Sequence, residues 1–116
     1  MAWYVYFIQS EHGGDIKIGK ARDVEKRRQD LQTGRPDNLE IRFTLKCKTE
    51  KEAYRLEHEL HQRFQRCLHN REWFFPCQEL LVYLAENRVA TPESVNRGII
   101  SLADNLINTL SYFLGR

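Results

Sequence analysis

The chain has 116 residues, of which 41% are hydrophobic and 29% charged, and its formal net charge is only +2. That length allows one domain with a single core, and no apolar run approaches the roughly 18–20 residues of a membrane span. A signal peptide is not evident, and the three cysteines form no C-x-x-C pair. We therefore expect reduced thiols, a cytoplasmic location and no membrane partner.

The first part of the chain is predicted to form a β-hairpin. Residues 2–9 alternate between the two faces of a strand, and Ile16 and Ile18 continue the period of two. Between these runs, Gly13 and Gly14 allow the positive backbone dihedrals of a tight turn. The two strands should therefore pair antiparallel.

A short helix and a third strand are predicted to follow. Asp23 is a suitable N-cap for a helix over residues 24–32, which ends before Gly34. Residues 39–47, LEIRFTLKC, alternate strictly between apolar and polar side chains. This is the clearest strand signal in the chain.

The next helix carries an acidic residue on its apolar side. Thr49 and Glu52 form a capping box at its start. The apolar stripe that follows consists of Ala53, Leu56, Leu60, Phe64 and Cys67. Glu57 falls inside this stripe, where an ionised carboxylate costs several kcal/mol unless it is paired or binds a cation. Two interpretations stay open, a structural salt bridge to an arginine or a metal ligand facing a cleft.

The rest of the chain is predicted to be mainly helical. After a short aromatic extended segment, HNREWFFP, we expect a helix over residues 78–88 and a longer one beyond Thr91. The order predicts an α/β (α+β) domain over residues 1–88, with a three-stranded antiparallel sheet flanked by helices, and a C-terminal helical extension over 89–116. The apolar stripe of the last helix either packs on the domain or forms a homodimer through residues 92–114.

Several residues of the first half have side chains suited to phosphate chemistry. Tyr4 and Tyr6 share one face of the first strand, and Lys17 lies on the second strand. Paired tyrosines on a sheet are usually packing residues, and a lysine there is usually solvated. Residues 16–28 contain six basic and two acidic side chains, a local excess that suits nucleic acid but is also typical of a solvated face.

Five short motifs occur in a fixed order: YVY, KIG, KRRQDLQTG, LEHELH and REWF. Together they resemble the GIY-YIG nuclease superfamily, in particular a branch common in phage and bacterial proteins, over residues 3–76. The resemblance implies a divalent-metal-dependent endonuclease with a GIY-YIG-like domain, acting on nucleic acid and most readily on DNA. A nucleic-acid-binding module that keeps the fold without cutting is the alternative.

The resemblance also implies roles for individual residues. Tyr6 corresponds to the proton-accepting tyrosine, Arg27 to the phosphate-binding arginine, and Glu57 to the ligand of one Mg²⁺ or Mn²⁺ ion. Lys17 replaces the tyrosine of YIG, and Tyr4 replaces the glycine of GIY. We expect Lys17 to complete the catalytic set by lowering the pKa of Tyr6.

The remaining candidates support this set. Four residues are auxiliary candidates: Tyr4, Lys20, His61 and Glu72. Five basic residues are expected to bind nucleic acid: Lys20, Arg22, Lys26, Arg28 and Arg35. His61 either orients Glu57, transfers a proton, or simply bonds solvent or backbone. A zinc site is a further alternative, but the histidine and cysteine spacings fit no common structural pattern.

Overall fold

The computed structural model describes residues 2–89, in which five strands and three α-helices follow one another. Their bounds are β1 Trp3–Ser10, β2 Ile16–Ala21, α1 Val24–Gln32, β3 Leu39–Cys47, α2 Glu50–Arg63, β4 Leu68–Asn70, β5 Trp73–Phe74 and α3 Gln78–Val89, with a 3-10 turn at Gln65–Cys67. The predicted final helix, with its dimer surface at 92–114, lies outside the described residues. None of the described helices has the length and apolar character that a membrane crossing requires.

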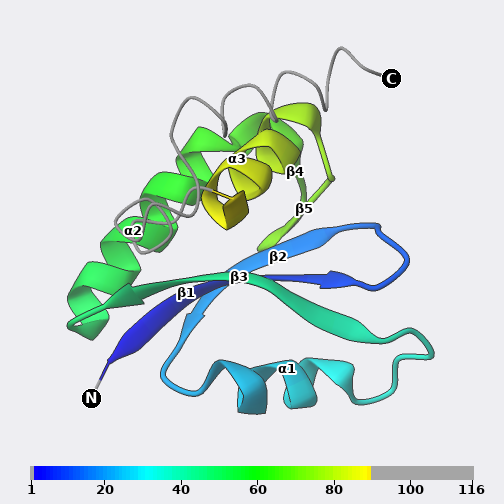
Figure 1. The fold of residues 1–116 in the computed structure, drawn as a ribbon, viewed down its shortest axis with the longest axis horizontal. Coiled ribbons are helices and arrows are strands. Elements are labelled where there is room, and N and C mark those ends of the chain that lie inside the picture. Colours follow the sequence, from blue (N-terminus) through cyan, green and yellow to red (C-terminus); the bar gives the residue numbers. More distant parts are fainter. Residues whose placement is uncertain (1, 90–116) are drawn as a thin grey trace. The chain divides into compact units, whose positions relative to one another are not determined.

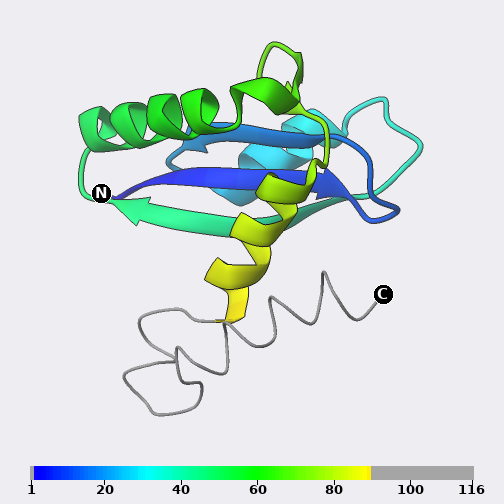
Figure 2. The ribbon, with the colours of Figure 1, turned by 90° about the horizontal axis from the view of Figure 1, so that it is seen from above.

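The five strands form one antiparallel sheet in the order β3-β1-β2-β5-β4. Figure 2 shows its long part, with β3 and β2 on either side of β1. The prediction of a three-stranded sheet is therefore wrong, because β5 pairs with β2 and β4 pairs with β5. These two strands have only two and three residues, which is too few to show a period of two in the sequence.

The helices α1 and α2 lie on opposite faces of the sheet (Figure 1). On the α1 face, Tyr6 and Ile8 of β1 form a buried cluster with Val24 and Leu39. Because side chains alternate along a strand, the fully buried Phe7 belongs to the α2 face. Strand β1 lies between β3 and β2 and is covered on both faces, so most of its side chains are buried.

The predicted caps and turn are confirmed. The side chain of Asp23 accepts a hydrogen bond from the backbone N–H of Lys26 at 3.0 Å, and that of Thr49 accepts one from Glu52 at 3.1 Å. In the β1–β2 turn, Gly13 and Gly14 have φ of 90° and 93°, which non-glycine residues rarely adopt. Local signals therefore define where these elements begin and turn.

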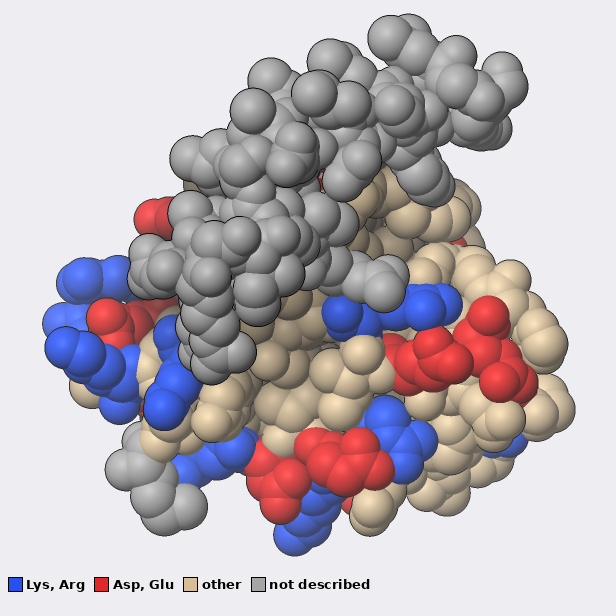
Figure 3. Space-filling model, in the orientation of Figure 1, with Lys and Arg blue, Asp and Glu red and all other residues tan. Residues whose placement is uncertain are grey.

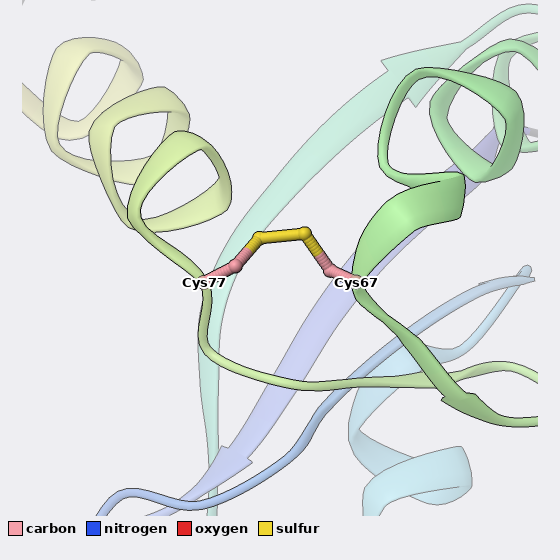
Figure 4. The surroundings of a disulfide bond; sticks show 2 residues. All are labelled: Cys67 and Cys77. Atoms are coloured by element: carbon pink, nitrogen blue, oxygen red, sulfur yellow. A yellow bond between two sulfur atoms is a disulfide. The ribbon is translucent and has the colours of Figure 1, made fainter.

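A disulfide joins Cys67 and Cys77, whose Cα atoms are 6.0 Å apart (Figure 4). The prediction of reduced thiols is wrong for this pair, while Cys47 is buried and unpaired. The β4–β5 hairpin turns the chain back on itself and brings together two cysteines that are ten positions apart. The expected cytoplasmic location was argued partly from reduced thiols, and the disulfide removes that support.

The chain divides into two compact units, Met1–Cys77 and Gln78–Arg116. All five strands and the helices α1 and α2 belong to the first unit, and α3 belongs to the second. The predicted division into residues 1–88 and 89–116 remains a prediction. Every candidate site residue lies in the first unit.

Candidate functional site

The candidate residues gather around β2, the strand between β1 and the short β5. Within β2, only Ile16 and Lys17 pair with β5, so most of this side of β2 has no strand partner. Both backbone polar groups of Ile18 are hydrogen-bonded. Its N–H donates to the carbonyl of Glu72 at 3.1 Å, and its carbonyl accepts from Nε2 of His61 at 2.8 Å. Of the alternatives for His61, the structure therefore has the bond to backbone.

Tyr6 lies directly across Gly19 of β2. The two residues are paired in the β1–β2 register, and the tyrosine is only 1% exposed. A Cβ atom added at Gly19 would lie 2.4 Å from the hydroxyl oxygen of Tyr6 and 2.6 Å from Cζ. Only glycine leaves room for the ring. Gly19 was not predicted as a site residue, although a glycine inside a strand often indicates such a close approach.

The cation that contacts Tyr6 is Arg27 of α1. The guanidinium donates a hydrogen bond to the phenol, and the same bond raises the pKa of Arg27. Burial raises the pKa of Tyr6, and the hydrogen bond and charge of Arg27 only partly oppose that rise. The expected role of Lys17 as the residue that lowers this pKa is not supported, because the charges acting on Tyr6 are those of Arg27, Glu72 and Glu57.

Lys17 pairs instead with Glu72. The residue is 6% exposed, and its Nζ lies 2.7 Å from Oε1 of Glu72 and 5.7 Å from the centre of the Trp73 ring. In the register, Lys17 faces Ile8 of β1, two positions away from Gly19. The carboxylate of Glu72, whose role the sequence left least defined, therefore compensates a buried ammonium group.

Glu57 is a partly buried carboxylate of α2 that makes no hydrogen bond or ion pair with any described residue. Burial raises its pKa, and so does the negative charge of Glu72, while the positive charges of His61, Lys20 and Lys17 oppose the rise. The structural salt bridge considered for Glu57 is thus absent from the described part of the chain. The carboxylate therefore has oxygens suited to a metal ion, and no described residue forms an ion pair with it.

Lys20 and Arg22 gather around Trp3 at the end of β2. The Nζ of Lys20 lies 5.2 Å from the centre of the indole ring and 3.3 Å from Oε2 of Glu50, and the Arg22 guanidinium lies 5.9 Å from the ring. Tyr4 is partly buried and lines a neighbouring hollow with Arg22. The aromatic ring holds two cations at the surface, where they are accessible to a polyanion.

Two of the other three predicted nucleic-acid-binding residues have an acidic partner. Arg28 pairs with Glu25 at 2.5 Å and Arg35 with Asp37 at 2.8 Å, whereas Lys26 is an exposed residue of α1. On the face shown in Figure 3, acidic and basic side chains are interspersed. The predicted basic surface is therefore divided by acidic partners that the sequence alone did not place.

A model of the T5orf172 domain matches residues 3–88. The chain belongs to the T5orf172 domain family. This is a nuclease-like domain family, which is consistent with a function that involves nucleic acid. No curated protein and no solved structure matches the chain.

The match corrects the assignment that the sequence motifs suggested. No GIY-YIG family model matches this T5orf172 domain, so the resemblance to that superfamily is wrong as a family assignment. The two departures already visible in the sequence, Lys17 and Tyr4, alter both of the motifs that give that superfamily its name. The individual side chains remain candidates because of the geometry in which they lie.

Proposed function

We propose that this T5orf172 domain is a divalent-metal-dependent endonuclease that hydrolyses phosphodiester bonds of nucleic acid, with DNA as the expected substrate. The observation that carries the proposal is the carboxylate of Glu57, which has no ion pair with a described residue and lies within electrostatic reach of the Tyr6 phenol. The phenol is itself bonded to Arg27. A ligand oxygen, a proton-transfer group and a cation thus lie close enough to act on one another electrostatically. The nuclease-like family supports the same class of function.

Arg27 suits the binding of the phosphate. A guanidinium has five N–H donors in a planar fork, and the bond to Tyr6 uses only part of them. The remaining donors match the geometry of phosphate oxygens and are charged at any working pH. We infer that Arg27 binds the non-bridging oxygens and at the same time keeps the Tyr6 ring in place.

Tyr6 suits the activation of water, with a defined pH requirement. Burial keeps the phenol protonated near neutral pH, and the adjacent Arg27 stabilises the tyrosinate once it forms. As a base, Tyr6 therefore becomes more effective as the pH rises. We expect the rate of cleavage to increase through the alkaline range rather than to level off at neutral pH.

Glu57 suits the binding of one Mg²⁺ or Mn²⁺ ion. Mg²⁺ is commonly held by one or two carboxylates, with water and substrate phosphate filling its other positions, and Glu57 is a carboxylate without another partner. When bound, such an ion polarises the phosphate and stabilises the leaving oxygen. Glu72 is already paired with Lys17, so we assign it the positioning of that lysine and not the metal.

The test uses the purified chain with labelled single- and double-stranded DNA and RNA. We expect cleavage of at least one substrate with Mg²⁺ or Mn²⁺ and none with EDTA, and a loss of about 100-fold or more in Tyr6→Phe and Arg27→Ala. Tyr54→Phe is the matched control, because Tyr54 is 59% exposed on α2. Binding without cleavage by well-folded protein would contradict the proposal and make the chain a nucleic-acid-binding module.

A further inference from the structure

A cavity lies at the end of the sheet where the β1–β2 turn meets the β4–β5 hairpin. Its volume is about 420 Å³, within the range of sites that hold small molecules. It is lined by Ser10, Gly13, Gly14, Asp15, Arg35, Asp37, His69, Asn70 and Trp73. Arg35, Asp37 and Trp73 were described above as predicted site residues or their neighbours, and the other six residues have no role in the proposed cleavage.

The cavity is next to the proposed active site on the same face of the sheet. Trp73 is paired with Lys17, and Lys17 shares a face of β2 with Gly19, over which Tyr6 lies. Two positions along a strand correspond to about 7 Å. A nucleic acid whose phosphate contacts Arg27 therefore has an adjacent nucleotide within reach of the cavity.

Two of the groups that line the cavity are planar, the Arg35 guanidinium and the Trp73 ring. The Arg35 guanidinium lies over the Trp73 ring at 5.5 Å, and Asp37 holds it there through a 2.8 Å ion pair. The same ion pair lowers the pKa of Asp37 to about 2, so the pair stays ionised at working pH. Nucleobases stack on aromatic rings and on guanidinium planes.

The polar groups of the cavity favour a base over a phosphate. Arg35 forms an ion pair with Asp37, and the His69 ring is in contact with the carboxylate of Asp15. The amide of Asn70, by contrast, has no hydrogen-bond partner among the described residues and presents both a donor and an acceptor. An arginine that is already paired holds a phosphate weakly, whereas the amide of Asn70 offers the donor and the acceptor that match the edge of a base.

We propose that this cavity binds one unpaired nucleobase, from the nucleotide next to the phosphate that is cleaved. A base inside a duplex cannot enter, because its edge is paired and its faces are stacked. The cavity therefore directs the protein to single-stranded or locally opened nucleic acid. This inference rests on the proposed function for the position of the strand, but the binding of the base does not require cleavage.

The test measures binding in EDTA, so that the outcome is independent of cleavage. The chain has two tryptophans, and Trp3→Phe leaves Trp73 as the only one, whose fluorescence is followed during titration. The probes are a single-stranded oligodeoxynucleotide, a duplex of the same sequence, and an oligomer of abasic deoxyribose phosphate of the same length. We expect the single strand to change the fluorescence and to bind about tenfold more tightly than the abasic oligomer.

Variants then locate the binding. In the Trp3→Phe background, Asn70→Ala is expected to weaken binding of the single strand several-fold without changing binding of the abasic oligomer. Gln62→Ala removes an exposed amide of α2 and serves as the matched control, expected to change neither. Equal affinity for the natural and abasic oligomers, or an unchanged affinity in folded Asn70→Ala, would overturn the inference even if the enzyme cuts. Selective binding of the base without any cleavage would support it and contradict the proposed function alone.

Discussion

At the scale of single residues, Glu57 is a carboxylate that makes no hydrogen bond or ion pair with any described residue. Its position could be inferred from the sequence, because one carboxylate interrupts an otherwise apolar stripe at helical spacing. Whether an arginine from elsewhere would meet it could not be inferred, since that depends on how distant segments pack. Because no described arginine pairs with Glu57, we expect this carboxylate to be a metal ligand and not half of a structural salt bridge.

We predict that Glu57→Gln stabilises the metal-free protein at neutral pH. Burial and Glu72 raise the pKa of Glu57 in the folded state, so the stability that the protonated group contributes at low pH is lost as the pH rises through the folded pKa. Glutamine does not ionise, and the variant should exceed the wild type by a few tenths to about 1 kcal/mol at pH 7, with a smaller difference at pH 4.

Urea unfolding in EDTA at both pH values measures this difference. Glu59→Gln is the control, because Glu59 is exposed on the same helix. Mg²⁺ or Mn²⁺ should raise the melting temperature of the wild type and leave that of Glu57→Gln unchanged. A variant that is less stable at neutral pH and still responds to metal would show that Glu57 has a structural role.

We predict that Gly19→Ala destabilises the fold and removes activity. The added methyl group would lie 2.4 Å from the Tyr6 hydroxyl oxygen, so the ring must move, and overpacking of this kind typically costs about 1–3 kcal/mol. In a Tyr6→Ala background the same substitution should cost much less, because the ring is gone. A double-mutant cycle of thermal melts checks this, and equal costs in both backgrounds would show that the ring is not the obstacle.

At the scale of elements, the long segments were predictable and the short ones were not. Strands β1, β2 and β3 and helices α1 and α2 have enough residues to show their periods, and their caps and turns have strong local signals. Strand β5 forms because the β2 backbone offers it hydrogen bonds, and β4 forms by pairing with β5, so both strands depend on the assembled sheet. For the same reason the partner of Lys17 could not be inferred, because Glu72 reaches it only through this hairpin.

We predict that Glu72→Gln is more harmful to the fold than the double variant Lys17→Met/Glu72→Gln. The side chain of Lys17 is 7% exposed, so removal of Glu72 leaves a buried ammonium group without its counter-charge, at about 1–3 kcal/mol. Methionine fills a similar volume without charge and should restore most of that loss. Chemical denaturation of the wild type, the two single variants and the double variant gives the coupling energy.

The control for this cycle is an exposed ion pair of the same sheet. Arg42 and Glu40 of β3 are 2.9 Å apart, with 26% and 47% of their side chains exposed. Glu40→Gln should therefore change stability by less than about 1 kcal/mol. A comparable loss in Glu72→Gln and Glu40→Gln would indicate that the burial of Lys17 has little energetic effect.

At the scale of the whole molecule, composition and net charge gave little information about function. The net charge of +2 does not show that cations lie at both ends of β2, around Trp3 and around Trp73. Charge along a sequence becomes a charged surface only when the fold determines which acids lie beside which bases. The general nature of the domain was therefore inferred from motifs, whereas its exact family and the shape of its sheet were not.

The Cys67–Cys77 bond has a topological consequence, because it closes a covalent ring around β4 and β5. Arg71, exposed at the tip of that ring with a φ of 56°, is a natural point of attack for trypsin. A chain cut only there still migrates as one species without reductant and separates into two fragments after reduction, which gel electrophoresis and mass spectrometry can check. The ring would thus keep Glu72 next to Lys17 in a molecule whose backbone is already broken.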